Sequence, residues 1–386
     1  MKHILLVPDL PIEHWPSMDR YASRLVQQIT DHASGLEISV ASEIGSLTVD
    51  EGTRVPGRRE SGSGTHRLEP TPTPSEFGRY LARYWFYPRR IKRTPADVLH
   101  VLDHSYAHVL NGESRTSVVT VHDLFPVIML ERSPSGLRER IRNRMLGKVL
   151  SGMRRANAWI VATDWLRGQL AEWLGKDEDI HVIPYGIDDA FFEQPGESQS
   201  ETRRRWKIPE EAFLVLHVGS ADRRKNLPAV IAVLGELRDT GIDAWLLQVG
   251  GTLTQGQTSE LADRGLEPFT RQVGAVSEND LRLAYHAADV LLFPSHYEGF
   301  GLPVLEAMAS RLPAVTSGAG GLAEVAGEAA VVVGGRDFQP YTDALRRIAN
   351  DGQWRKELVN RGLERAARFT WSETAKKTVE VYRSLA

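Results

Sequence analysis

Residues 289–310, DVLLFPSHYEGFGLPVLEAMAS, carry three structural signals in immediate succession. The apolar run at 289–293 is bounded by Pro294 and is typical of a strand buried on both faces of a parallel sheet. A loop with two glycines follows, and Pro303 is typical of the first turn of a helix. A strand that leads through a short loop into a helix is the repeating unit of α/β proteins, so we expect an α/β fold.

Similar apolar runs recur along the chain and fall into two series. The first series covers 3–8, 36–41, 98–102, 117–121, 158–163 and 181–184. The second covers 213–218, 244–249, 269–273, 290–293, 314–316 and 330–333. Helical stretches separate several of these runs, and 386 residues exceed the length at which one hydrophobic core usually keeps growing. The sequence therefore predicts two α/β domains.

The predicted domain boundary lies in the polar stretch 186–205, whose Gly and Pro residues suit an interdomain linker. We assign the first domain to 1–190, the linker to 191–205 and the second domain to 206–370. The tail 371–386 has apolar positions at helical spacing and predicts a C-terminal helix. Residues 50–75 are rich in Gly, Ser, Pro and Thr, so we expect a flexible surface loop there.

The composition excludes several classes of protein. The chain has no cysteine, which rules out disulfides and thiolate metal sites. Its 47 Lys and Arg residues nearly balance 50 Asp and Glu residues, so no overall positive charge recruits nucleic acid. The apolar opening is interrupted at Asp9 and is too short for a secretory or membrane-spanning segment. We expect a cytoplasmic protein.

The loop before Pro303 is a candidate anion site. Glycines at 299 and 301 allow the backbone to approach a ligand closely. Amides at a helix start have no intrahelical partner and favour an anion such as a phosphate. Here they belong to Phe300, Gly301 and Leu302. A ligand-free turn between strand and helix is the alternative, and the glycines alone do not decide between the two.

Two glutamates flank this loop. Glu306 lies about one turn into the helix, and helical side chains lean toward the N-terminus. Its carboxylate is therefore positioned to bind hydroxyls of a group attached to the phosphate, such as a ribose. Glu298 precedes the helix, where a carboxylate suits the hydroxyls of a sugar. Surface glutamates without a ligand are the alternative.

A second stretch, LHVGSADRRKNLPAVIAVL at 216–234, repeats this pattern. A buried strand ends at Gly219, the cations Arg224 and Lys225 follow, and a helix begins near Pro228. Open α/β sheets bind ligands at the carboxyl ends of their strands, so these cations are placed to neutralise a diphosphate. A solvated basic turn is the alternative.

Together these motifs resemble glycosyltransferase family 4, a retaining family with the GT-B fold. The resemblance rests on G…RKN and on E-x7-E from Glu298 to Glu306. It extends in the same order over VTVHDLFP (119–126), VIPYGID (182–188) and FTWSETAKKTVEVYRSL (369–385), and so covers nearly the whole chain. It implies two Rossmann-like domains facing across a cleft, with the acceptor on the first and the sugar nucleotide on the second. It also implies that the C-terminal helix crosses back to the first domain.

The resemblance also implies residue roles. Lys225 and Arg224 would hold the diphosphate, Glu306 the ribose and Glu298 the donor sugar. His122 ends a strand of the first domain and would face the donor sugar. The expected catalytic residues are His122, Glu298, Lys225 and Arg224. The expected donor-binding residues are Gly219, Arg224, Lys225, Glu298, Phe300, Gly301, Leu302 and Glu306.

Other positions near the predicted strand ends are less distinctive. Asp123 either orients His122 or caps the next turn, and Asp103, His104 and His108 follow another strand. The chain departs from many relatives at Ser17 and Met18, where they have a Gly-Gly pair. It also departs at Ser220, where several have arginine, which leaves the phosphate charge to Arg223, Arg224 and Lys225. Asp188 and Asp189 suit a turn or helix cap better than a metal site.

The predicted function is retaining, metal-independent transfer of a hexose from GDP-mannose or a UDP-sugar. The acceptor is a glycan, a lipid-linked molecule or a small molecule, as in polysaccharide biosynthesis. No cofactor and no nucleic acid partner are expected. The alternatives are a noncatalytic sugar-nucleotide-binding subunit and a GT-B sugar-nucleotide epimerase, while a phosphorylase is disfavoured because no lysine context suits a pyridoxal cofactor.

Residues 77–93, FGRYLARYWFYPRRIKR, interleave aromatic rings and cations in the first domain. This composition suits a lipid-linked acceptor or peripheral contact with the inner membrane face. An amphipathic helix packed on the sheet is the alternative, and it is favoured because aromatic stripes on helices usually belong to the core.

Overall fold

A computed structural model describes residues 1–10, 16–41, 46–48, 76–125, 127, 136–335 and 337–385. The predicted loop at 50–75 lies outside these residues. The chain forms two compact units. Unit 1 comprises Met1–Ala162, Arg167–Ile183 and Trp371–Ala386, and unit 2 comprises Thr163–Leu166 and Pro184–Thr370. Residues 191–205, expected as a linker, belong to unit 2 and include helix α7 (Gln199–Arg205).

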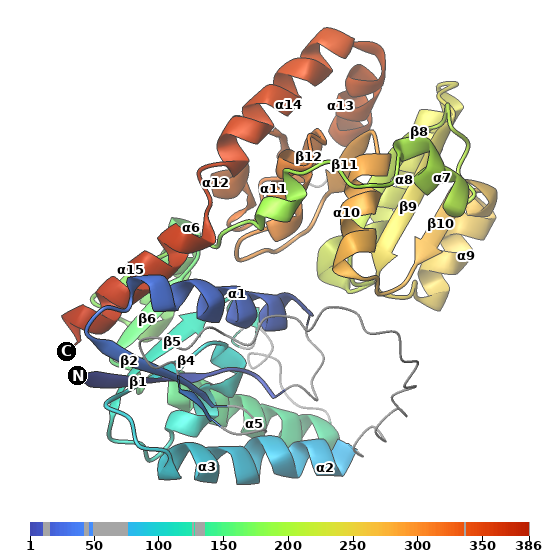
Figure 1. Ribbon diagram of the computed structural model, residues 1–386. Helices are drawn as coiled ribbons and strands as arrows, with labels where there is room; N and C mark the ends of the chain where they lie inside the picture. Colours follow the sequence, from blue (N-terminus) through green and yellow to red (C-terminus); the bar gives the residue numbers. More distant parts are fainter. Residues whose placement is uncertain are drawn as a thin grey trace, which may run out of the picture. The chain divides into compact units, whose positions relative to one another are not determined.

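Unit 1 is built on a sheet of strand order β3-β2-β1-β4-β5-β6-β7 (Figure 1). The described strands are β1 (Lys2–Val7), β2 (Leu36–Ala41), β3 (Ser46–Thr48), β4 (Val98–Val101), β5 (Thr116–Val121), β6 (Ala158–Val161) and β7 (Ile180–Val182). Neighbouring strands pair in parallel except β3, which pairs antiparallel with β2. The residues of β4 and β6 are buried throughout, as expected for strands covered on both faces.

The helical elements described in unit 1 are α1 (Pro16–His32), α2 (Glu76–Leu81), the π-helix η2 (Ala82–Phe86), α3 (Tyr87–Arg93), the 3₁₀ helix η3 (His104–Leu110), α5 (Leu137–Met153), α6 (Asp164–Leu174) and α15 (Trp371–Ser384). The first residues of α6 belong to unit 2. Helix α15, drawn in red, lies beside the blue helix α1 (Figure 1). The Tyr382 hydroxyl lies 2.6 Å from His100 Nδ1 on β4, so the C-terminal helix packs into unit 1 as predicted.

Unit 2 is built on a parallel sheet of order β10-β9-β8-β11-β12-β13. Its strands are β8 (Phe213–Gly219), β9 (Ala244–Gly250), β10 (Thr270–Val273), β11 (Val290–Phe293), β12 (Ala314–Ser317) and β13 (Val331–Val333). This order is that of the doubly wound dinucleotide-binding fold. The chain adds β9 and β10 on one side of β8 and then returns to add β11, β12 and β13 on the other side. The prediction of an α/β fold is confirmed.

The remaining elements of unit 2 are α7, the 3₁₀ helices η4 (Asp189–Phe191), η5 (Arg223–Lys225) and η6 (Glu267–Phe269), and the helices α8 (Leu227–Asp239), α9 (Gln255–Asp263), α10 (Glu278–Ala287), α11 (Leu302–Ala309), α12 (Leu322–Ala326), α13 (Gln339–Asn350) and α14 (Gly352–Ala366). Helix α8 begins at Leu227 and α11 at Leu302, each with proline as its second residue, close to the predicted helix starts. The core lies between the sheet and the apolar faces of α8 and α13.

Candidate active site

The reversal of strand order between β8 and β11 determines where the two predicted loops meet. Both strands end at the same edge of the unit 2 sheet, and the loops that follow them flank the reversal point. In doubly wound folds this is the point at which ligands bind. The structure therefore brings together the cations that follow β8 and the glycine loop that follows β11.

Lys225 and Glu298 form a buried ion pair across these loops. Lys225 Nζ lies 2.6 Å from Glu298 Oε1, and each residue is only 8% exposed. Burial lowers the pKa of Lys225, whereas the neighbouring Glu298 carboxylate opposes this shift. Lys225 Nζ also lies 4.8 Å from the ring centroid of Phe293. The lysine charge is thus held in a partly apolar site at the end of β11.

Arg224 reaches the same carboxylate from the more exposed side. Its Nη1 atom lies 3.4 Å from Glu298 Oε2. One carboxylate therefore neutralises two cations, and both remain close to the loop at 299–301. Arg223 and Ser220 lie in exposed positions.

Lys225 packs closely over Gly219. A Cβ atom at Gly219 would lie 3.3 Å from both Cδ and Cε of Lys225, closer than most Cβ contacts. The Gly219 carbonyl accepts hydrogen bonds from Gly251 N and Gln248 Nε2. Gly219 thus lets the lysine stem cross the end of β8.

Backbone contacts fix the two loops relative to one another. His296 N donates to Arg224 O over 2.7 Å, and Asn226 Nδ2 donates to Pro294 O over 3.1 Å. Asn226 has a φ of +55°, a left-handed conformation that asparagine tolerates better than most residues. This explains why an asparagine follows the two cations.

The predicted anion-binding residues lie at the start of α11. Gly301 has a φ of +112°, and a Cβ atom there would overlap Leu322. The amides of Phe300, Gly301 and Leu302 have no hydrogen-bond partner in the described part of the chain. The Phe300 ring is buried against the rings of Tyr185 and Phe369. Phe300 therefore offers its amide and anchors the loop with its side chain.

Glu306 is buried one turn into α11. Its Oε2 atom accepts a 2.7 Å hydrogen bond from the hydroxyl of Tyr285 on α10. Tyr285 is fully buried and packs edge-on against Phe191. The sequence reasoning missed Tyr285, although a tyrosine on the apolar face of a helix needs a hydrogen-bond partner.

Gly320 and Gly321 pack against the backbone of the loop that carries Glu298 and Gly299. Neither glycine was among the predicted site residues. Gly321 N donates to Glu298 O over 2.8 Å. A Cβ atom at Gly320 would overlap Glu298 O, and one at Gly321 would overlap Gly299 O. Thr163 Oγ1 donates to Gly299 O over 2.9 Å. The Gly-Gly pair at 320–321, in the glycine-rich loop that follows the predicted strand 314–316, was the available signal.

His122 lies in unit 1, directly after β5, and is buried. Its Nε2 atom donates to Leu102 O over 2.8 Å, which leaves Nδ1 as the acceptor nitrogen of a neutral imidazole. Burial lowers the pKa of His122 and favours this neutral form. Its ring meets Tyr21 edge-on at 4.9 Å between centroids.

The remaining predicted unit 1 residues follow the ends of β4 and β5. His104 Nδ1 lies 3.3 Å from Asp103 Oδ1, and His104 Nε2 lies 3.6 Å from Asp123 Oδ1. Asp123 also accepts a hydrogen bond from Phe125 N, so it caps the following turn. His108 Nε2 donates to Arg83 O, and burial lowers the pKa of His108 to about 4.

Asp9 joins this group from the end of β1 and was missed as a functional candidate. It is 9% exposed, and neither carboxyl oxygen accepts a hydrogen bond from a described residue. Burial, followed by the charge of Asp103, raises the pKa of Asp9 to about 9. An aspartate at the end of an apolar strand was the signal. Ser17 and Met18, by contrast, lie within the first turn of α1.

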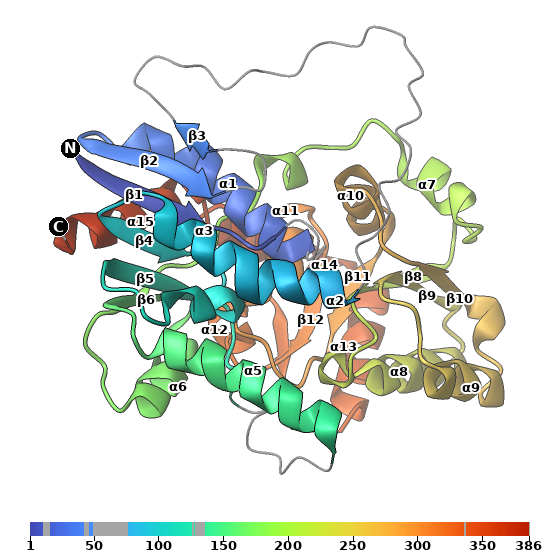
Figure 2. The same cartoon turned by 90° about the horizontal axis from the view of Figure 1, so that it is seen from below.

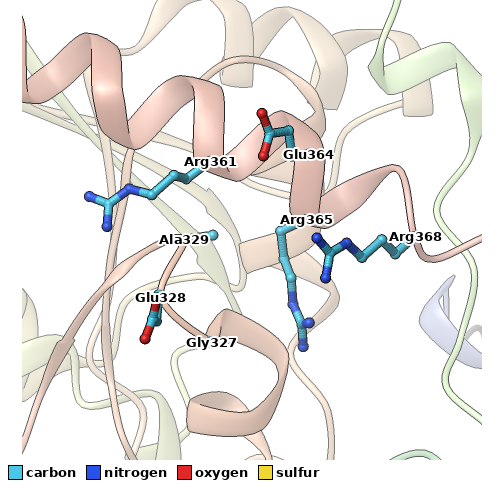
Figure 3. A pocket seen from close by; sticks show the side chains of 7 residues that line it. All are labelled: Gly327, Glu328, Ala329, Arg361, Glu364, Arg365 and Arg368. Carbon is cyan, nitrogen blue, oxygen red and sulfur yellow. The ribbon is translucent and has the colours of Figure 1, made fainter.

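Unit 2 also contains an arginine-lined pocket of about 350 Å³ between α14 and the loop after α12 (Figure 3). Arg361 and Arg365 lie on α14, Arg368 follows its C-terminus, and the Arg365 side chain points toward the segment that contains Gly327. Arg365 donates to the carbonyls of Glu324 and Val325, and it thereby holds the end of α12. No described helix is long and apolar enough to span a membrane.

Both halves of the chain match models of glycosyltransferase families. Residues 19–191 match the model of Glycosyltransferase Family 4, and residues 198–365 match that of Glycosyl transferases group 1. O-antigen chain mannosyltransferase B of Escherichia coli is 25% identical over 78% of each chain. D-inositol 3-phosphate glycosyltransferase of Frankia alni is 33% identical over 64% of this chain and 63% of its own length.

Solved structures show the same fold over the full chain. Sucrose-phosphate synthase of Thermosynechococcus elongatus has a TM-score of 0.73 at 21% identity and covers 100% of this chain and 99% of its own. Anabaena HepE in complex with UDP-glucose has a TM-score of 0.72 at 16% identity and covers 100% of both. The chain therefore belongs to the family 4, group 1 glycosyltransferases and has the GT-B fold.

Proposed function

We propose that this protein transfers a hexose from a nucleotide diphosphate sugar to an acceptor, with retention of anomeric configuration and without a metal. The observation that carries the proposal is the pairing of Lys225 and Arg224 with Glu298 at the end of the unit 2 sheet. The amides at 300–302 begin the helix that follows the Glu298 loop. These groups provide positive charge and hydrogen-bond donors where a doubly wound sheet binds its ligand.

The proposed chemistry follows from the charge that develops when the donor bond breaks. The leaving diphosphate gains negative charge, and Lys225, Arg224 and the loop amides stabilise it. The same groups supply the positive charge that a metal ion would otherwise provide, which supports metal independence. We propose same-face attack, with the leaving phosphate oxygen accepting the proton of the acceptor, and we assign no protein nucleophile.

Donor binding would rearrange the ion pair around Glu298. In the ligand-free site Glu298 neutralises both cations, so an incoming diphosphate takes over that role. The carboxylate then becomes available to accept hydrogen bonds from hydroxyls of the donor sugar. Glu306, held by Tyr285, would bind the ribose, and Gly219 would allow the diphosphate to approach the end of β8.

The first domain, residues 1–190, is proposed to hold the acceptor, and residues 206–370 the donor. We propose that His122 faces the donor sugar with its imidazole in the neutral form. Acceptor hydroxyls would meet the polar residues that follow β1, β4 and β5. A lipid-linked acceptor agrees with the aromatic and cationic residues at 77–93, which we propose as a peripheral contact with the cytoplasmic face of a membrane.

The names of related proteins support two donors. The Escherichia coli relative is named a mannosyltransferase, as is a relative from Mycolicibacterium hassiacum that is 32% identical over 219 residues, and this favours GDP-mannose. The HepE structures contain UDP or UDP-glucose, which favours a UDP-sugar. Both donors remain in the proposal.

Thermal unfolding with UDP-, GDP-, ADP- and dTDP-sugars tests donor binding. One nucleotide class should raise the midpoint, because a ligand at a hundred times its Kd stabilises by about 2.7 kcal/mol. Lys225→Ala should abolish this shift and reduce donor hydrolysis or transfer roughly a hundredfold, the typical cost of one transition-state contact. Glu298→Ala should also lose turnover.

Arg368→Ala and Glu364→Ala are matched controls, since both residues are exposed in the same unit, and each should behave like the wild type. The absence of any shift with all four nucleotide classes would contradict the proposal. Binding without turnover over an acceptor panel would instead identify a noncatalytic subunit. Conversion of the donor to its epimer without an acceptor would identify an epimerase.

A further inference from the structure

Large apolar side chains are exposed mainly on one part of unit 1. Among the described residues, six large apolar side chains are exposed, and four of them lie on α2, η2 or α5. They are Tyr80 (38%), Trp85 (54%), Phe86 (62%) and Ile141 (49%). A cluster of exposed aromatic and aliphatic side chains on one surface is typical of an interaction site.

The π-helix η2 explains why two of these aromatics face outward. Tyr87 and Ile91 of α3 are buried, and the Tyr87 hydroxyl donates to Pro8 O over 2.7 Å, so α3 packs against the sheet. No residue of η2 is buried. A π-turn places an extra residue in the helical repeat and shifts the facing of neighbouring side chains. Trp85 and Phe86 are therefore turned away from the face that Tyr87 and Ile91 use.

Helix α5 continues this surface. The Tyr80 hydroxyl lies 3.5 Å from Met145 Sδ on α5, and Ile141 lies one helical turn before Met145. A groove of about 440 Å³ runs between the two helical segments. Its walls include Tyr84 and Pro88 on one side and Arg144 and Lys148 on the other. Figure 2 shows α2 and α3 running alongside α5.

The charge of this surface is strongly positive although the whole chain has a formal charge of −3. The segment 76–93 has one acidic residue, Glu76, and 137–153 has one, Glu139. The cations are Arg79, Arg83, Arg89, Arg90, Lys92 and Arg93 on the first segment, and Arg138, Arg140, Arg142, Arg144 and Lys148 on α5. All five cations of α5 are exposed. In the described part of the chain, no carboxylate forms an ion pair with them.

We propose that this two-helix surface, formed by α2, η2, α3 and α5, docks on a bilayer that contains anionic phospholipids. Trp85, Phe86 and Ile141 enter the interfacial region, and the row Arg140, Arg144 and Lys148 contacts lipid phosphates. The inference rests on the proposed membrane contact at 77–93 and extends it to α5, which supplies the phosphate-binding cations.

The arrangement favours a lipid surface over other anionic partners. Arg89 stacks on Trp85, with its guanidinium carbon 3.5 Å from the ring centroid. A positive charge therefore lies directly beside an exposed amphipathic ring. This combination suits the headgroup level of a bilayer, where apolar rings and charged groups meet. Binding through phosphates alone would leave Phe86 and Ile141 without a role, and protein interfaces are generally poor in charged residues at their centres.

Co-sedimentation of the full chain with phosphatidylcholine vesicles, with and without phosphatidylglycerol, tests the proposal. The wild type should sediment with the anionic vesicles, and added salt should weaken the binding. Replacing Arg140, Arg144 and Lys148 together by Gln should weaken binding roughly fivefold per cation removed. Trp85→Ala with Phe86→Ala should also release the protein from the anionic vesicles.

The matched controls lie in unit 2, where Arg361→Gln with Arg368→Gln removes exposed cations and Val332→Ala removes an exposed apolar side chain. Both controls should sediment like the wild type. The proposal is overturned if the wild type does not sediment, if it binds both vesicle types equally, or if the two-helix variants bind normally. Dimerisation that these variants abolish, without vesicle binding, would assign the surface to a second copy and also overturn it.

Catalysis without vesicles separates this inference from the proposed function. The two-helix variants should hydrolyse the sugar nucleotide like the wild type while losing vesicle binding. Lys225→Ala should show the reverse, with normal sedimentation and roughly a hundredfold slower donor hydrolysis. Each proposal can therefore fail while the other stands.

Discussion

At the residue scale, Asp9 is the most unusual titratable group of unit 1. Its carboxyl group is buried beside Asp103, and its pKa is raised from 3.8 to about 9. The folded protein therefore binds a proton that the unfolded chain releases between these two pH values. Stability should fall as pH rises from about 4 to 9, because an acid with a raised folded pKa favours folding only while it is protonated.

We predict that Asp9→Asn makes the protein more stable at pH 7 and flattens the dependence of stability on pH between 4 and 9. Asparagine retains the shape of the protonated acid but has no ionised form to stabilise the unfolded chain. Urea unfolding at several pH values measures the effect, with the exposed Asp239→Asn as the control. Equal destabilisation of Asp9→Asn at every pH would show instead that Asp9 is ionised in the folded protein.

At the element scale, the loop after β11 depends on the loop after β12. Gly321 has an ordinary φ of −74°, so alanine there causes no backbone strain. Its Cβ atom would nevertheless overlap Gly299 O and lie 2.8 Å from Thr163 Cγ2. The loop that carries Glu298 or the loop that carries Gly321 must then shift.

Gly321→Ala should therefore cost about 1–3 kcal/mol of stability, the usual range for overpacking, and should weaken donor binding. Calorimetry of unfolding and titration with the nucleotide identified by thermal shift measure the two effects. Gly256→Ala is the matched control, because a Cβ atom at Gly256 meets nothing within 4 Å. Unchanged donor affinity in Gly321→Ala would show that the loop tolerates displacement.

Features that depend on neighbouring residues could be predicted from the sequence, whereas contacts between residues far apart in the chain could not. The strand and helix of 289–310 were predicted because their signals are local, and β11 and α11 lie within one residue of the expected positions. The contact between Lys225 and Glu298 joins residues 73 positions apart. It depends on β8 lying next to β11, which no local signal specifies. The same holds for Tyr285 and Glu306, since their contact requires α10 to pack beside α11.

The π-turn at Ala82–Phe86 was also beyond local prediction. Aromatic stripes on helices usually pack in the core, and this held for Tyr87 in the neighbouring helix. The π-turn shifts the helical repeat, and the side chains of Trp85 and Phe86 are exposed to solvent. The sequence pattern of 77–93 therefore did not specify which aromatic side chains are exposed. In the structure Tyr87 is buried, whereas Trp85 and Phe86 are exposed.

At the scale of the whole molecule, the C-terminal helix α15 belongs to unit 1, together with the N-terminal residues. Helix α15 follows unit 2 in sequence but packs on α1, where Trp371 contacts the ring of Tyr21 at 5.9 Å between centroids. Burial lowers the pKa of His100 to about 3, so its neutral ring bonds Tyr382 on one side and Thr120 on the other. The last helix thus completes the core of unit 1.

Deletion of residues 371–386 should therefore destabilise unit 1 and leave unit 2 nearly intact. Amide hydrogen exchange should accelerate in α1, β4 and β5, which lose packing partners, and should stay slow in β8 and β11, because exchange reports the local free energy of opening. Tyr382→Phe should show a milder form of the same pattern, at a cost of about 1–3 kcal/mol for leaving His100 without its partner. Equal acceleration in the strands of both units would mean that they unfold as one cooperative body.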